Sequence, residues 1–370
     1  MKSRSMYVCL AIAMLLWAGP AMAAVSVEYV NTSGTGTNCV ANANNLVFGV
    51  NTACGNAGPD TPWLVKIRPG IYCVSTTIDL TSCAGKVDIE GEGRYVTIID
   101  GSDVAGAPVV SLADGGSLRE LTIKADRTGK SPASAVVGVQ TNGSAQLFRV
   151  EFDLLGDGGD VTGIQQPPTG ASVLVLGEVQ MAVNNNLATS TNVGVWVSDK
   201  AQIRRSEITA KGGQAVRAVY TPNAADIFLY NTWIDARDTE NALAVLSGGS
   251  ATWPNAIRLT NVRATATGTT TSRTVYLEDQ QAYIDQSVLG ASGPYSRGIV
   301  TSPSFTFGLM VNFTRIFVPN AGFSLALNAS GAGVTVGGSS LSGTTPVSGT
   351  ATCVSTWEAV TNTMLSSTCS

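Results

Sequence analysis

The stretch Val216-Arg-Ala-Val-Tyr-Thr-Pro-Asn-Ala-Ala-Asp-Ile-Phe-Leu-Tyr230 decides the fold. It holds two short β-prone runs, around Val219 and Ile227, that are separated by turn-forming residues. Apolar residues equivalent to Val219 recur every 24–31 residues. They are Val139, Ile164, Val195, Val219, Val245, Val275, Ile299 and Leu325. A second apolar column advances with the first and comprises Leu147, Val173, Ile203, Ile227, Ile257, Ile284, Leu309 and Val336.

Two columns with this period indicate a solenoid in which each repeat is one coil. Leucine-rich repeats share the period, but their Leu-x-x-Leu-x-Leu pattern is missing, and propeller blades need about 40 residues. The sequence therefore predicts an all-β fold, a right-handed parallel β-helix. Each coil would contribute about three short strands, and stacked inward columns would form one continuous core.

Composition supports this prediction and limits the chemistry. The chain has 370 residues, 40 of them Gly, with 13% charged residues and no His. A single globular core rarely exceeds roughly 300 residues, whereas a solenoid lengthens freely. The absence of His excludes Ser-His-Asp catalysis and His-based metal sites. The net charge of −4 and the lack of a basic run argue against nucleic-acid partners.

The first 23 residues have the pattern of a secretory signal peptide. Lys2 and Arg4 precede an apolar run from Val8 to Trp17, and Ala21-Met-Ala23 is a small-x-small cleavage site. No later segment is long and apolar enough for a transmembrane helix. We therefore expect export to the periplasm, the cell surface or the medium.

Cleavage at that site would remove Cys9 and leave six cysteines: Cys39, Cys54, Cys73, Cys83, Cys353 and Cys369. An even number in an exported chain predicts a disulfide framework. Fifteen connectivities are open. Loop-closure entropy favours nearest neighbours, which would pair Cys39 with Cys54, Cys73 with Cys83, and Cys353 with Cys369.

Both ends of the solenoid need caps, because end coils expose sheet edges. Between positions 41 and 53, Leu46, Val47 and Val50 fall on one helical face, which predicts a short amphipathic capping helix. The predicted organisation is a signal peptide at 1–23, an N-terminal cap at 24–60, the β-helix at 61–350 and a disulfide-closed tail at 351–370.

Two segments carry a resemblance to a known fold. They are Leu64-Val-Lys-Ile-Arg-Pro-Gly-Ile-Tyr72 and Val87-Asp-Ile-Glu-Gly-Glu-Gly-Arg-Tyr-Val-Thr-Ile-Ile-Asp-Gly101. Over about 40 residues they resemble the opening coils of the pectin-lyase-like β-helix superfamily, nearest to its pectin methylesterase branch. The resemblance implies the scaffold of that superfamily, and fold alone does not imply function.

The catalytic residues of that branch are largely missing. Asp157 follows Phe152 at a spacing similar to that of the first catalytic Asp of pectin methylesterases. Their Asp-Phe-Ile-Phe-Gly and Leu-Gly-Arg-Pro-Trp stretches are absent, as are the Asp-Asp pair and Gly-His-Gly of polygalacturonases. The resemblance thus leaves Asp157 as the one candidate catalytic residue.

The loop from Leu154 to Gly163 is the second candidate site. Asp153, Asp157 and Asp160 offer carboxylate oxygens of the kind that Ca²⁺ prefers, and calcium is the one cofactor this pattern suggests. The alternative is a solvated turn, since Gly-Asp-Gly-Gly is common turn chemistry.

Aromatic residues next to the first column form the third candidate. Trp196, Tyr220 and Tyr276 would make a stripe for sugar rings if they point outward. Arg217 shares the parity of Val219, which favours Tyr220 pointing inward as core instead.

Together these features predict an exported, non-catalytic β-helix that binds a polysaccharide or a cell-surface glycan, as an adhesin-like or envelope-associated protein would. The alternatives are a divergent carbohydrate esterase or polysaccharide lyase that acts on a pectin-like chain, or a structural spacer. Oligomeric state is not encoded in any motif of the chain.

Overall fold

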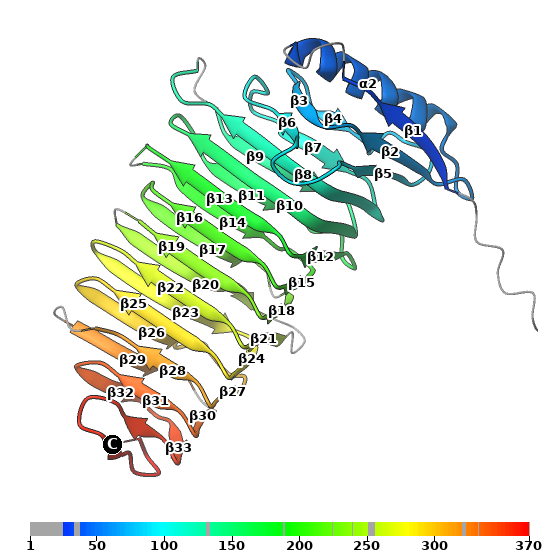
Figure 1. The fold of residues 1–370 in the computed structure, drawn as a ribbon. Helices are drawn as coiled ribbons and strands as arrows, with labels where there is room; N and C mark the ends of the chain where they lie inside the picture. Colours follow the sequence, from blue (N-terminus) through cyan, green and yellow to red (C-terminus); the bar gives the residue numbers. More distant parts are fainter. Residues whose placement is uncertain are drawn as a thin grey trace, which may run out of the picture.

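The computed structural model of the 370-residue chain describes residues 25–32, 38–130, 134–187, 189–223, 225–238, 240–250, 256–319, 323–331 and 333–369. These residues form a parallel β-solenoid with one helix, α2, at its N-terminal end (Figure 1). The predicted signal peptide at 1–23 lies outside the described residues.

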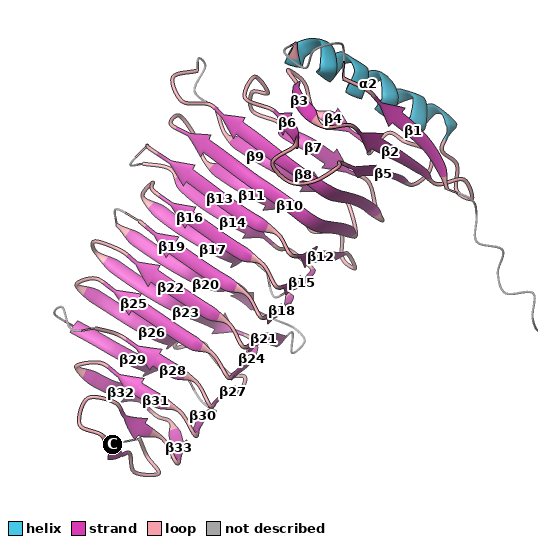
Figure 2. Ribbon diagram, in the orientation of Figure 1, coloured by secondary structure: helices cyan, strands magenta, loops and turns pink. Residues whose placement is uncertain are grey.

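The strands fall into two sheets. Figure 2 shows the strands stacked along the solenoid, with α2 at one end. The first sheet has 11 strands: β4 Ile78–Asp79, β7 Pro108–Leu112, β9 Val136–Thr141, β11 Val161–Gln165, β14 Thr191–Trp196, β17 Ala215–Thr221, β20 Asn241–Ser250, β23 Thr271–Asp279, β26 Tyr295–Thr301, β29 Phe323–Ala329 and β32 Thr345–Gly349. The second has 24: β1 Ser26–Val30, β2 Trp63–Ile67, β3 Gly70–Cys73, β5 Val87–Glu90, β6 Thr97–Asp100, β8 Gly116–Asp126, β10 Ala145–Gly156, β12 Val173–Gly177, β13 Gln180–Asn185, β15 Lys200–Arg204, β16 Glu207–Lys211, β18 Asp226–Tyr230, β19 Trp233–Arg237, β21 Ala256–Thr260, β22 Arg263–Thr267, β24 Gln281–Asp285, β25 Val288–Ser292, β27 Leu309–Asn312, β28 Arg315–Phe317, β30 Val334–Gly337, β31 Ser340–Ser342, β33 Thr352–Val354, β34 Trp357–Glu358 and β35 Thr363–Met364.

A coil consists of three strands in succession, such as β15, β16 and β17. Each pairs in parallel with its equivalent in the next coil, so β15 pairs with β18, β16 with β19, and β17 with β20. Stacked strands lie about 4.8 Å apart. This repetition confirms the predicted β-helix, and it explains how a long, weakly charged chain buries a core.

The first inward column is confirmed through seven of its eight members, from Val139 to Ile299. The eighth is wrong by two residues, because Ile299 pairs with Leu327 rather than Leu325. The second predicted column mixed two neighbouring inward columns, and its member Val173 is wrong, because Val173 lies on the outer face in register with Lys200. The observed one is Leu147, Leu176, Ile203, Leu229, Leu259, Ile284, Val311 and Val336. A shift of two keeps a side chain on the same face, so most of the misassigned residues still face the core.

Between the first and second strands of a coil, or within the long strands β8 and β10 that span both, a single residue in the left-handed region turns the chain. In successive coils this residue is Glu120, Arg149, Glu178 and Arg205, with φ between 49° and 55°. Their side chains form a ladder of alternating charge: Arg149 lies 3.0 Å from Glu120 and 2.9 Å from Glu178, and Arg205 lies 3.3 Å from Glu178. The hydrogen bond from Arg149 lowers the pKa of Glu178. Opposite charges in neighbouring coils thus attract one another along the ladder.

The N-terminal cap is α2, an 18-residue helix that spans Cys39–Asn56. It begins at Asn38, whose side chain accepts a hydrogen bond from the Ala41 N–H. Leu46, Val50 and Ala53 are buried on the face that meets the first coil. The expected helix is therefore present, although it is longer than the predicted 41–53, and Val47 is only partly buried.

Two of the three expected disulfide pairings are wrong. Cys39 pairs with Cys73, Cys54 pairs with Cys83, and only Cys353–Cys369 joins nearest neighbours. The reason is the helix itself: Cys39 and Cys54 stand near its two ends, and 15 residues of α-helix span about 22 Å. A disulfide needs Cα atoms roughly 4.4–6.8 Å apart. The two bonds instead fasten both ends of α2 to the first coils.

At the other end, β33, β34 and β35 continue or close the second sheet, and Cys353–Cys369 joins the last coil to the tail. Leu365 packs against the core, whereas Trp357 is 43% exposed. Three disulfides indicate folding in an oxidising compartment. Among the described residues, α2 is the only helix, and its hydropathy is too low for a membrane-spanning segment.

Tyr72 offers a test of the first coils, because its ring is fully buried and its hydroxyl donates to the Arg68 carbonyl at 2.8 Å. Burial, reinforced by the charge of Glu92, raises the pKa of Tyr72 from 10.0 to about 12. The folded state therefore keeps a proton that the unfolded state loses above pH 10, so stability should fall between pH 10 and 12 by about 2–3 kcal/mol. Tyr72→Phe should remove that alkaline step in urea titrations. An identical pH dependence in the variant would contradict the assignment.

Candidate functional site

The outer face of the 11-stranded sheet carries the candidate site, and a bend in each strand creates it. The register passes from Val193–Arg217 to Val195–Val219 and omits Gly194 and Ala218 between them. The same position holds small residues throughout: Gly138, Gly163, Gly194, Ala218, Ala244, Thr274, Gly298 and Ala326. At this bend the alternation of buried and exposed residues shifts phase.

The phase shift places two residues three apart on the same outer face. In β17, Arg217 and Tyr220 are both half-buried, whereas Val216, Ala218 and Val219 are fully buried. The parity argument for an inward Tyr220 is therefore wrong, because strict alternation does not run through the bend. Trp196 and Tyr276 occupy the equivalent position in their strands, with Leu246 between Tyr220 and Tyr276.

The three predicted aromatic residues thus lie in one outward column. The ring centroids of Trp196 and Tyr220 are 5.1 Å apart in an edge-to-face arrangement. None of the three is fully buried. Aromatic rings presented in this way offer flat apolar faces with polar edges, which suits a sugar ring.

Arginines form a second outward column beside the aromatic one, and the sequence reasoning missed them. Arg217, Leu243, Arg273 and Arg297 are in register over four coils. The guanidinium of Arg217 lies 4.4 Å from the centroid of Tyr220, and that of Arg273 lies 5.0 Å from Tyr276. The signal that could have found them is their spacing, because Arg273 and Arg297 are separated by one period of the repeat. We call these six residues, Trp196, Arg217, Tyr220, Arg273, Tyr276 and Arg297, the arginine–aromatic face.

The charges of this face are uncompensated within the part of the chain that the structure describes. No carboxylate there forms an ion pair with Arg217, Arg273 or Arg297. The Nε atoms of Arg217 and Arg297 are buried without a hydrogen-bond partner among those residues. Burial lowers the pKa of Arg273, and the like charge of Arg297 lowers it further. An anion placed here would relieve both costs.

A hollow of about 240 Å³ lies between Arg217 and Arg273. Leu243 lines it between the two arginines, and Asn241 and Thr271 line its side. Arg217 and Arg273 are two coils apart, about 10 Å at the usual strand spacing. An anionic group with a flat body fits between two such cations over an apolar floor.

Two of the three aspartates predicted as a metal or catalytic site accept hydrogen bonds from the backbone of neighbouring coils. Asp157 accepts a hydrogen bond from the Gly129 N–H at 2.6 Å, and Asp160 accepts one from the Thr191 N–H at 2.8 Å. Asp153 is exposed on β10, in register with Lys124 of the preceding coil. Both Asp157 and Asp160 thus join turns of neighbouring coils, as the turn alternative proposed.

The described residues contain no group of three or more His, Cys, Asp or Glu side chains placed to hold a metal ion. Within the same ranges, Asp157 forms no ion pair with an arginine or lysine. Calcium binding at Asp153, Asp157 and Asp160, and catalysis at Asp157, stay predictions from the sequence.

No protein-family model matches the chain, and no curated protein matches its sequence. Among solved structures it is similar to the ORF18 protein of Geobacillus virus E2, with a TM-score of 0.45 and 13% identity over 95% of this chain. This chain spans 62% of the length of that viral protein. It is also similar to the rice weevil pectin methyl esterase, with a TM-score of 0.39 and 13% identity over 91% of this chain and 87% of the other. A pectin methylesterase mutant in complex with a hexasaccharide gives a TM-score of 0.26 and 12% identity, over 90% and 80% of the two chains.

These similarities concern the fold alone. The strand register and the arginine–aromatic face define the class of the protein: a disulfide-capped parallel β-solenoid with a cationic, aromatic outer face.

Proposed function

We propose that this protein is an exported, non-catalytic β-solenoid that binds an acidic glycan through the arginine–aromatic face. The observation that carries the proposal is the pair of in-register arginines, Arg273 and Arg297, which lie one coil apart without a carboxylate partner in the described residues. Two like charges held together at a partly buried surface are costly unless an anion joins them.

The neighbouring aromatic column favours a sugar over a simple anion. Tyr220 and Tyr276 each stand beside an arginine of the same strand, so a column of ring faces and a column of cations run side by side along the solenoid axis. A uronic acid chain likewise presents ring faces and carboxylates side by side along its length. The chain as a whole is acidic, so attraction would come from these local contacts and not from net charge.

The competing proposal, a carbohydrate esterase or lyase centred on Asp157, needs a second carboxylate or an arginine beside that residue. The described residues place neither in an ion pair or metal-type cluster with it. Export rests on the signal-peptide pattern at 1–23 and is supported by the three disulfides.

The experiment is a binding titration with polygalacturonate and with a neutral glucan as the reference polymer. Arg273→Gln/Arg297→Gln should weaken polygalacturonate binding to this face at least tenfold, because two charge-assisted hydrogen-bonding groups are lost. Affinity electrophoresis in gels that contain increasing amounts of each polymer measures binding as a loss of mobility of the protein band.

The matched control is Arg263→Gln/Arg315→Gln. These two arginines also stand over aromatic rings, Trp233 at 5.1 Å and Phe317 at 5.7 Å, but on the other sheet. The control should bind as the unmodified protein does. Equal loss in both variants, or no retardation of the unmodified protein by any acidic polymer, would overturn the proposal.

A further inference from the structure

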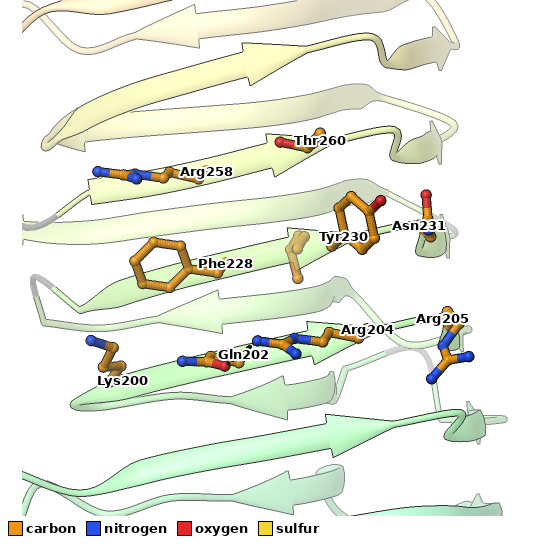
Figure 3. Close-up of a pocket in the computed structure, with 10 residues that line it drawn as sticks. Lys200, Gln202, Arg204, Arg205, Phe228, Tyr230, Asn231, Arg258 and Thr260 are labelled. Carbon is orange, nitrogen blue, oxygen red and sulfur yellow. Dashed lines mark hydrogen bonds between the residues drawn. The ribbon is translucent and has the colours of Figure 1, made fainter.

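A second hollow, larger than the one between Arg217 and Arg273, lies on the outer face of the 24-stranded sheet. It runs across the outer face of β15, β18 and β21 and has a volume of about 630 Å³. Figure 3 shows its lining: Lys200, Gln202 and Arg204 from β15, Phe228 and Tyr230 from β18, and Arg258 from β21. We call this feature the β15–β21 groove.

Cations and rings alternate along the groove. Gln202, Phe228, Arg258 and Tyr283 are in register. The Nζ of Lys200 lies 5.3 Å from the Phe228 centroid, and the guanidinium of Arg258 lies 5.4 Å from both Phe228 and Tyr283. Stacking on rings holds these cations in place, so a ligand would not need to order them.

The groove carries more positive than negative charge. Lys200 lies 3.9 Å from Asp226, and Arg205 is paired with Glu178. Arg204 instead donates to the neutral Gln202 side chain at 2.8 Å, and Arg258 has no carboxylate partner within the described ranges. Two cationic groups therefore remain available to a ligand, and charge complementarity selects an anionic one.

The spacing of the charges along a ligand distinguishes a nucleic acid from an acidic glycan. Duplex DNA presents one phosphate for about every 1.7 Å of axis and is bound by many basic side chains. Here two uncompensated cations are spread over three coils, roughly 10 Å, between aromatic rings and amide and hydroxyl groups. A glycan with one acidic group per sugar or per few sugars matches that spacing better than a nucleic acid does.

We propose that the β15–β21 groove is a second acidic-glycan site, and that one molecule bridges two glycan chains. The inference rests on the proposed function of the arginine–aromatic face. The three coils of the groove also carry the middle of the arginine–aromatic face, from Arg217 to Tyr276, because β15 and β17, β18 and β20, and β21 and β23 belong to one coil each. They lie on different sheets, so two chains can bind at once.

The test counts sites with an oligogalacturonate hexamer by isothermal titration and measures bridging separately. For bridging, protein bound to polygalacturonate beads captures a soluble fluorescent polygalacturonate, with EDTA present to exclude calcium cross-links. The unmodified protein should bind two hexamers and capture the soluble chain. Arg204→Gln/Arg258→Gln should bind one hexamer and lose at least nine-tenths of the capture, with an unchanged melting temperature.

The variants of the two sites separate the two proposals. If the unmodified protein binds one hexamer, which only Arg273→Gln/Arg297→Gln abolishes, the proposed function stands and this inference fails. If only Arg204→Gln/Arg258→Gln abolishes binding, the proposed function of the other face fails and so does bridging. Arg263→Gln/Arg315→Gln should retain both sites and full capture.

Two further arms identify the ligand class. In the first, a sulfated hexasaccharide replaces the oligogalacturonate hexamer. Comparison of the two affinities shows whether the groove binds sulfate or carboxylate groups more tightly. Single-stranded DNA that displaces the hexamer from the groove at lower concentration than the glycan itself would overturn the assignment to a glycan.

Discussion

A variant that lacks both N-terminal disulfides should lose on the order of 6–8 kcal/mol from the stability of its first coils. The substitutions are Cys39→Ser/Cys73→Ser together with Cys54→Ser/Cys83→Ser. The closed loops span 34 and 29 residues, and each contributes about 3–4 kcal/mol by restricting the unfolded chain. The effect should be the largest of any disulfide change in the chain.

The physical reason extends beyond chain entropy. An isolated 18-residue helix is marginal in water, so α2 depends on packing Leu46, Val50 and Ala53 against the first coil. Without the two bonds, α2 should detach and expose that coil. Limited proteolysis should then cleave within 39–56 while the later coils remain intact, because solenoid repeats contact only their neighbours.

The matched control is Cys353→Ser/Cys369→Ser, which opens a loop of 16 residues at the other end. It should cost about 3 kcal/mol locally and leave α2 resistant to protease. Peptide mapping without reduction offers an independent check. A Cys39–Cys54 linked peptide would contradict the observed pairing and the argument built on it.

The second large effect is expected at the bend of the 11-stranded sheet. Gly298→Val should destabilise the protein by about 3 kcal/mol or more, through overpacking. A Cβ at Gly298 would lie 2.2 Å from the Ile316 Cγ2 atom and 2.5 Å from the Ala326 carbonyl oxygen. The carbonyl belongs to the backbone of the next coil, so relief requires a shift of the stacked strand.

Gly290→Val is the matched control for this substitution. A Cβ there meets its nearest atom, Thr265 Cγ2, at 3.6 Å, and the residue lies in β25, where a β-branched side chain is favoured. Its stability should change by less than about 1 kcal/mol. Urea unfolding of both variants provides the measurement. Equal stability would show that the bend does not require a small residue.

The bend also explains why Gly recurs at one position in the strands of the 11-stranded sheet. Where the bend residue is Gly, a large core side chain fills the space opposite, as Phe152 does at Gly138, Met181 at Gly163 and Ile208 at Gly194. Small bend residues therefore let the strand turn inward and bring Arg217 and Tyr220 onto one face. The candidate site depends on this local packing.

The solenoid was predictable from the amino-acid sequence because the inward columns repeat with the period of the coil. The period can be recognised even when a strand is misaligned by two residues, since such a shift leaves an inward-pointing side chain pointing inward. The capping helix was predictable for a similar reason: Leu46 and Val50 have helical spacing. These are local patterns, and local propensity is encoded in neighbouring residues.

Only the tertiary structure decided the disulfide pairing and the outward faces. Loop-closure entropy favoured Cys39 with Cys54, but the helix between them holds the two residues too far apart. The steps from Arg217 to Leu243, Arg273 and Arg297 are 26, 30 and 24 residues, so the register that aligns the three arginines is set by strand stacking and not by spacing alone. The sequence by itself thus determined a repeating core and its cap. Stacking of neighbouring coils determined which cysteines meet, and which charged and aromatic side chains share a surface, because those contacts join residues that are distant along the chain.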